Sequence, residues 1–132
     1  MCKTQQFTLF WKHLCFYDNQ SSFYFKFDLL FTGYFSHPDM AYNVIAVHWT
    51  PLATWDNYFV AAKNAVRVGQ YSGQTVGLYM LIHGLGQTPD QIHAIGFSLG
   101  AHLVGNFART IKNDAGSISR VTGNYLLIWF SL

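Results

Sequence analysis

The stretch "IHAIGFSLGAHLVGNFAR", residues 92–109, decides the fold of this 132-residue chain. It begins with a short apolar run that has the composition of a buried strand. It ends with an amphipathic segment whose apolar residues recur at helical spacing. Between the two lies "GFSLG", residues 96–100, a G-x-S-x-G motif. The pattern predicts a strand, a tight turn at Ser98 and a helix that starts at about Leu99.

A serine at such a turn has two interpretations. As a nucleophile, Ser98 would stand in strained backbone geometry at the top of the sheet, with Gly96 and Gly100 leaving room for the adjacent strand and helix. The Leu99 amide, at the helix N-terminus, could then donate to a developing oxyanion. As a structural residue, Ser98 would simply cap the helix, since serine is a favoured N-cap. The local sequence leaves both interpretations open.

The rest of the chain alternates strand and helix signals. A buried strand is expected at residues 42–49 and a helix at 55–71, which can continue past a break near Gly73. The helix carries Phe59, Ala62, Val66 and Gly69 on its apolar stripe. A second helix is expected at 99–111, a loop at 113–117 and a third strand from 118. Residues 22–31 also contain a weak strand signal. This order predicts an α/β fold, a mainly parallel sheet with flanking helices.

Composition narrows the class of protein. Hydrophobic residues make up 51% of the chain and charged residues 11%, against roughly 25% charged in a typical soluble domain. The net charge of +2 is too small to favour nucleic acid as a partner. Cys2 and Cys15 do not form a disulfide framework. The N-terminal residues make a poor secretory signal, and no apolar stretch is long enough to cross a membrane.

Four blocks resemble consecutive parts of the pancreatic-lipase family of animal lipases, especially its arthropod members: "YNVIAVHW", "AAKNAVRVGQY", "GQTPDQIHAIGFSLGAHLVGNFAR" and "SRVTG". The resemblance implies a partial α/β-hydrolase fold, secretion, and hydrolysis of triacylglycerol or phospholipid esters by a Ser-Asp-His triad. Ser98 matches the family nucleophile, and Leu99 matches the residue whose backbone N–H makes half of the oxyanion hole. Gly96 and Gly100 match the two elbow glycines.

The resemblance also divides the chain. Residues 41–123 form a partial lipase domain, residues 1–40 a divergent N-terminal segment, and residues 124–132 an unrelated apolar tail. The tail includes "YLLIWF", which has high β-propensity and no charge, proline or glycine. Such a composition is typical of aggregation-prone segments.

The triad acid and base of the family find no match here. The family has its acid in "LDPA" directly after "VTG", where this chain has Asn124 and Tyr125. Asp114, the one acid after Ser98, falls at the wrong end of the expected third strand. No histidine follows His102 in these 132 residues. The chain therefore resembles a truncated lipase.

The other histidines are expected to be structural. His48 replaces the aspartate of the family's "VDW" and precedes Ser98, whereas the base in this fold follows the nucleophile. His83-Gly84 is not the family's oxyanion "HG", because it comes after the strand at 42–49. We expect the elbow to turn Ser98 away from His102, and His93 to be a satisfied residue at the edge of a strand.

The expected function is carboxylic ester hydrolysis by ancestry, without metal or cofactor, in a chain that is itself inactive. A lipid ester is the expected substrate, and a lipid surface a possible contact. The alternative from another class is a non-catalytic homologue that binds lipid or serves as storage, as insect yolk proteins do. The intact Ser98 argues for enzyme ancestry. A third alternative is that no stable protein exists.

Overall fold

The computed structural model describes residues 6–12, 32–33, 36, 42–49, 52–53 and 57–124. The strand signal at residues 22–31 and the apolar stretch at 125–132 lie outside the described residues. The elements, in chain order, are β1 (Gln6–Lys12), β2 (Tyr42–His48), α2 (Tyr58–Ser72), the π-type helix η2 (Gly73–Gly84), the short 3₁₀ helix η3 (Pro89–Gln91), β3 (Ile92–Phe97), α3 (Leu99–Ala115) and β4 (Arg120–Asn124).

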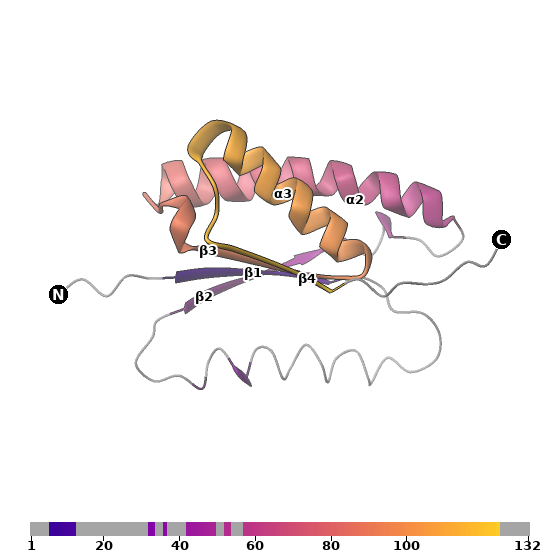
Figure 1. Cartoon of the computed structure of the whole chain (residues 1–132), viewed down its shortest axis with the longest axis horizontal. Coiled ribbons are helices and arrows are strands. Elements are labelled where there is room, and N and C mark those ends of the chain that lie inside the picture. The colour runs from indigo at the N-terminus through magenta and orange to yellow at the C-terminus, as the bar shows by residue number, and fades with distance from the viewer. Residues whose placement is uncertain are drawn as a thin grey trace.

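The four strands form one parallel sheet in the order β2-β1-β3-β4. Gly96 of β3 pairs with Trp11 on one side and with Gly123 on the other. Because all pairs are parallel, the strands end at the same edge of the sheet. The helices α2, η2 and α3 lie together over one face of this sheet (Figure 1). The predicted α/β fold with a mainly parallel sheet is confirmed.

The strand β1 is not predicted by the sequence pattern, yet it lies inside the sheet between β2 and β3. Its sequence, "QFTLFWK", sits in an aromatic-rich region that has no steady period and no turn residues to mark its ends. Long-range pairing with two other strands, rather than local sequence, therefore defines this element.

The core lies between the sheet and the helix layer, and α2, η2 and α3 all contribute buried residues to it. Along β3, buried residues alternate with partly buried ones, as expected for a strand that presents one face to the helices. The predicted stripe of α3 is confirmed, since Leu99, Leu103, Phe107 and Ile111 are all buried. The helix runs further than expected, because residues 113–115 are helical, and it is followed by Gly116 with a φ of 102°.

The buried face of α2 includes Gly69 of the predicted stripe but not Phe59 or Val66. Phe59 is 78% exposed and Val66 37% exposed, whereas Ala61, Ala65 and Gly69 are buried. Close packing against α3 explains the difference. A Cβ atom at Gly73 would lie 2.7 Å from Cβ of Thr110, so only small residues fit along this contact. The larger side chains of α2 therefore remain on its outer surface.

His93 joins β3 to β4 on the sheet face away from the helices. Its Nε2 lies 2.9 Å from Oγ1 of Thr122, so the expectation of a satisfied histidine is confirmed. Burial in the first place, and the charge of Arg120 in the second, lower the pKa of His93 from its ordinary value of 6.5. The folded state thus favours the neutral imidazole.

We predict that the stability of the chain falls with acidification in a way that depends on His93. Above pH 6.5, the ordinary pKa, both states hold His93 neutral and the group contributes no pH dependence. Below it, the unfolded chain binds a proton more readily than the folded chain, so the free energy of unfolding decreases. Urea unfolding across this range should show a smaller decrease in His93→Gln.

The exposed His83 provides the control for this measurement, because His83→Gln should retain the acid-dependent decrease of the wild type. Equal pH profiles of His93→Gln and the wild type would contradict the prediction.

Candidate active site

Ser98 lies between the last residue of β3 and the first residue of α3, as the sequence predicts. Its backbone has φ 56° and ψ −124°. Among the described residues it is the one non-glycine residue with a positive φ. L-residues rarely adopt this region, and holding one there costs about 1–3 kcal/mol. The surrounding fold must therefore impose the conformation on this serine.

The Ser98 side chain does not cap α3, which argues against the interpretation of Ser98 as a simple N-cap. Ser98 occupies the N-cap position of α3, but its hydroxyl makes no capping hydrogen bond. The backbone provides the contact instead, because Ala101 N donates to the Ser98 carbonyl oxygen at 2.9 Å. The hydroxyl, on a half-buried residue, is left available for chemistry.

Gly96 allows the strand and the helix to approach each other beside Ser98. A Cβ atom there would contact the Gly100 carbonyl oxygen, and it would lie 2.5 Å from the Gly100 carbonyl carbon and 2.8 Å from Ala101 N. Backbone atoms cannot move aside as flexible side chains can. The sequence prediction that a side chain at Gly96 would collide with its surroundings is confirmed.

The N-terminus of α3 provides positive potential at the same place. Leu99 is the first residue of this 17-residue helix, and no acidic residue lies in its first turn. The first N–H groups of a helix have no acceptor within the helix and carry the positive end of its dipole. The Leu99 N–H is therefore suited to stabilising negative charge that develops next to Ser98.

The strands on both sides of β3 end close to this turn. Phe97 pairs with Asn124, the last residue of β4. On the other side, Trp11 of β1 pairs with Gly96, so the end of β1 is level with Phe97. The family resemblance places the triad acid just after β4, and the structure puts that strand end beside Ser98. Tyr125, which stands at the acid's position, lies outside the described residues.

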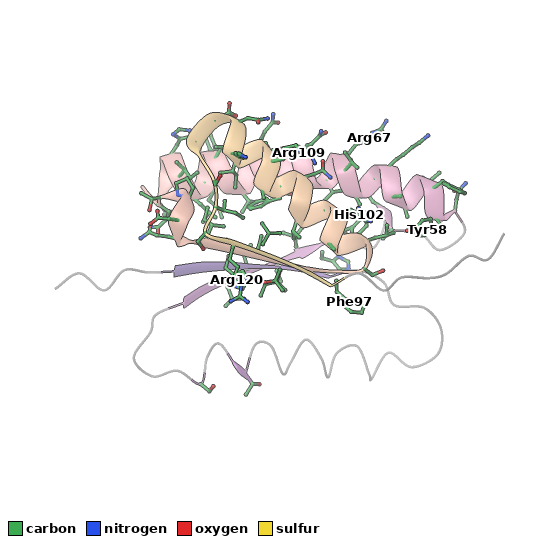
Figure 2. All side chains as sticks on the ribbon, viewed as in Figure 1. Tyr58, Arg67, Phe97, His102, Arg109 and Arg120 are labelled. Atoms are coloured by element: carbon green, nitrogen blue, oxygen red, sulfur yellow. The ribbon has the colours of Figure 1, made fainter. Side chains whose placement is uncertain are left out.

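The histidines of the described part do not hydrogen-bond the Ser98 hydroxyl. His48 is the last residue of β2, at the same end of the strands as Ser98. Because β1 lies between β2 and β3, His48 is about 10 Å from Phe97 across the strands. His102 is exposed in α3, at the same end of the molecule as Phe97 (Figure 2). His83 lies at the end of η2, ahead of the start of β3 and so at the opposite edge.

Asp114 is likewise far from the nucleophile. It lies in the last turn of α3 rather than in a loop, which corrects the sequence prediction. Helix geometry separates it from Ser98 by about 24 Å along the axis. Its position at the wrong end of the molecule agrees with the expectation that it is not the triad acid.

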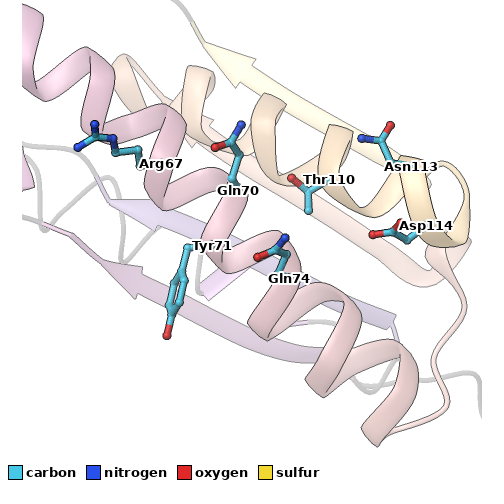
Figure 3. Close-up of a pocket in the computed structure, with 7 residues that line it drawn as sticks. All are labelled: Arg67, Gln70, Tyr71, Gln74, Thr110, Asn113 and Asp114. Carbon is cyan, nitrogen blue, oxygen red and sulfur yellow. The ribbon is translucent and has the colours of Figure 1, made fainter.

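A separate polar groove of about 480 Å³ lies between α2 and α3 (Figure 3). It is lined by Arg67, Gln70, Tyr71, Gln74, Thr110, Asn113 and Asp114. These residues belong to the second half of α2, the start of η2 and the last turns of α3, away from Ser98. Over the described ranges, no three His, Cys, Asp or Glu side chains gather as a metal site would require. None of the helices described there is long and apolar enough to cross a membrane.

Comparison with known proteins decides the family. The family model described as "Lipase" matches residues 30–124, most of the chain. The chain belongs to the lipase family. The partial parallel sheet with its covering helices is accordingly a partial α/β-hydrolase fold. The matched region begins after β1, so one of the two inner strands of the sheet is contributed by residues outside it.

The relatives are vertebrate lipases. The chain is 38% identical over 88 residues to "Hepatic triacylglycerol lipase" of Oryctolagus cuniculus, covering 67% of this chain and 17% of that protein. It is 38% identical over 82 residues to "Lipase member H" of Xenopus tropicalis, covering 62% and 16%. It is 38% identical over 81 residues to "Pancreatic triacylglycerol lipase" of Oryctolagus cuniculus, covering 61% and 16%. The chain thus spans about one sixth of the length of these relatives.

Proposed function

We propose that this chain carries the nucleophilic part of a lipase-family carboxylic ester hydrolase. Ser98 is the nucleophile, Leu99 gives one oxyanion donor, and Gly96 and Gly100 are the elbow glycines. The substrate class is a lipid ester, a triacylglycerol or a phospholipid, and the site of action is extracellular. The strained Ser98 turn with its free hydroxyl is the observation that carries the proposal.

The chemistry of such a site is acyl transfer. The Ser98 Oγ attacks the ester carbonyl carbon while a base takes its proton, and the carbonyl oxygen becomes an oxyanion. The Leu99 N–H donates a hydrogen bond to this oxyanion. The alcohol then leaves with a proton, and water hydrolyses the acyl-enzyme. The geometry of the turn supports the first step, because Ser98 stands at the sheet edge beside the positive end of α3.

We assign no residue of this chain as the base or the acid of the triad. Tyr125 occupies the acid's position, and no histidine follows His102. We infer that residues 41–123 are a partial lipase domain, to which β1 adds a strand, and that a complete domain of this family has its acid where Asn124 and Tyr125 stand here. Sequencing the transcript beyond the codon for Gly123 tests this, with "LDPA" and a later histidine as the expected reading. A transcript that reads on as this chain does would contradict it.

An intact nucleophile in strained geometry favours hydrolase ancestry over the alternative of a lipid-binding or storage homologue. A binding protein gains nothing from a serine held at a positive φ, and the strain would disappear with glycine at this position. The glycine at 96 and the helix N-terminus add the close packing and the backbone donor that a reacting serine uses.

We predict that the purified chain hydrolyses short p-nitrophenyl esters no faster than its own Ser98→Ala variant. Loss of the triad histidine alone costs about 10⁶-fold in kcat, and the histidines of the described residues do not hydrogen-bond the Ser98 hydroxyl. The release of p-nitrophenol by the two proteins, measured side by side, checks this. A rate above background that disappears in Ser98→Ala would show that another histidine, such as His48, serves as base.

We also predict that Ser98 is acylated selectively when added imidazole serves as the base. Treatment with p-nitrophenyl acetate and imidazole, followed by peptide mass spectrometry, should label Ser98 about 10²-fold faster than a serine without an oxyanion donor. The exposed Ser117, in the loop after α3, is the internal control. Equal labelling of Ser98 and Ser117 would overturn the assignment of Ser98 as nucleophile.

A further inference from the structure

The outer surface of α2 has an unusual composition for a helix that faces water. Phe59, Lys63, Val66 and Arg67 recur at i, i+4, i+7 and i+8, which places them on one face. All four are exposed, and the Phe59 ring is 78% exposed. Tyr58, 50% exposed, packs edge-on against Phe59 with 6.2 Å between ring centroids. We call Phe59, Lys63, Val66 and Arg67 the basic–aromatic face.

The charges on this side of the molecule are mostly of one sign. Residues 58–84, which span α2 and η2, contain no aspartate or glutamate. The neighbouring helix α3 adds the exposed Arg109 and Lys112, against one acid, Asp114, in its last turn. Arg67 and Arg109 both project on the side of the helix layer that faces away from the sheet (Figure 2). A negatively charged partner complements such a surface.

The basic–aromatic face begins at the end of the molecule that carries Ser98. Tyr58 is the first residue of α2, and it lies at the same end as Phe97 and His102 (Figure 2). Phe97 directly precedes Ser98 in the chain. The first turn of α2 and the turn at Ser98 are therefore at the same end of the molecule.

We propose that the basic–aromatic face binds the surface of an anionic phospholipid membrane. A helix with exposed aromatic and aliphatic residues between cations lies in the plane of a lipid–water interface, with its apolar side chains inserted. Lysine and arginine near an anionic bilayer each strengthen binding about fivefold. The choice of a lipid partner rests on the proposed function, because a lipase-type nucleophile acts on esters held in such a surface.

The exposed aromatic side chains could also contact a protein, and charge distinguishes the two partners. An isolated apolar patch would fit a protein interface, whereas cations interleaved with Phe59 and Val66, without acids over 27 residues of helix, fit a sheet of phosphate groups. The structure therefore favours an anionic bilayer.

The test is flotation of the 132-residue chain with vesicles of phosphatidylcholine, alone or with about one third phosphatidylglycerol. The chain should bind the anionic vesicles more tightly, and added salt should weaken this binding through charge screening. Arg67→Gln should weaken it about fivefold, and the double variant Lys63→Gln with Arg67→Gln roughly 30-fold. Phe59→Ser should weaken it as well, through loss of the inserted ring.

Two matched controls lie outside the face. Tyr79, in η2 at the other end of the helix, is 78% exposed like Phe59, and Tyr79→Ser should bind as the wild type does. Arg120 is an exposed cation on the opposite side of the sheet (Figure 2), so Arg120→Gln should also leave binding unchanged. Circular dichroism of each variant checks that its fold is retained. The salt dependence is measured on the wild type, so it tests the proposal even if a variant fails to fold.

Equal binding to neutral and anionic vesicles, no binding to either, or equal effects of Arg67→Gln and Arg120→Gln would overturn the proposal. Ser98→Ala should bind vesicles as the wild type does, because the surface does not involve the hydroxyl. Vesicle binding without selective acylation of Ser98 would contradict the hydrolase proposal and support the membrane-binding face. Selective acylation of Ser98 without vesicle binding would support the hydrolase proposal and contradict the membrane-binding face.

Discussion

The site depends on the close approach of two backbones, the end of β3 and the first turn of α3. Gly96 lies against the Gly100 carbonyl group and Ala101 N, at distances that a Cβ atom could not share. Because the helix starts directly above the strand, the one residue that links them must reverse the chain within a single step. Ser98 does so with a positive φ, which a side chain normally disfavours. The strain at Ser98 is thus a consequence of the packing at Gly96.

The helix layer holds α3 in the place that this turn requires. The contact between α2 and α3 is made by small residues, so the two helix backbones lie close together. At Gly69, a Cβ atom would lie 2.9 Å from Cβ of Asn106 and would contact the Leu103 carbonyl oxygen. Leu99, Leu103, Phe107 and Ile111 of α3 are buried in the core, and the side chains of Phe107 and Ile111 lie against Gly77 of η2. The same close packing leaves the bulky side chains of α2 on its outer surface, where they form the basic–aromatic face.

Local sequence predicts the parts of this fold in which one segment determines its own structure. The strand, turn and helix around Ser98 follow from an apolar run, two glycines and a helical stripe, and all three are confirmed. The strand β1 could not be predicted, because its pairing with β2 and β3 comes from residues distant in sequence. The predicted stripe is wrong at Phe59 and Val66, since helical periodicity does not reveal that α3 leaves no room for a Cβ atom at Gly69 or Gly73.

The candidate site divides in the same way. Ser98, Leu99 and Gly96 are neighbours in sequence, and their geometry follows from the local pattern. A triad acid and base come from distant segments, and among the described residues the end of β4, after which the family has its acid, lies beside the nucleophile. The family resemblance indicates that an aspartate follows β4 in a complete lipase domain. This chain has Tyr125 at that position.

The central claim, that the fold imposes a strained backbone on Ser98, is tested most directly by urea unfolding of the wild type and of Ser98→Gly. Glycine adopts the φ of 56° without steric penalty. After the entropic cost of glycine in the unfolded chain, the account predicts that Ser98→Gly increases the free energy of unfolding by about 1 kcal/mol. An ordinary N-cap serine would instead lose a few tenths of a kcal/mol on replacement by glycine. A Ser98→Gly variant that is equally or less stable than the wild type would contradict the account.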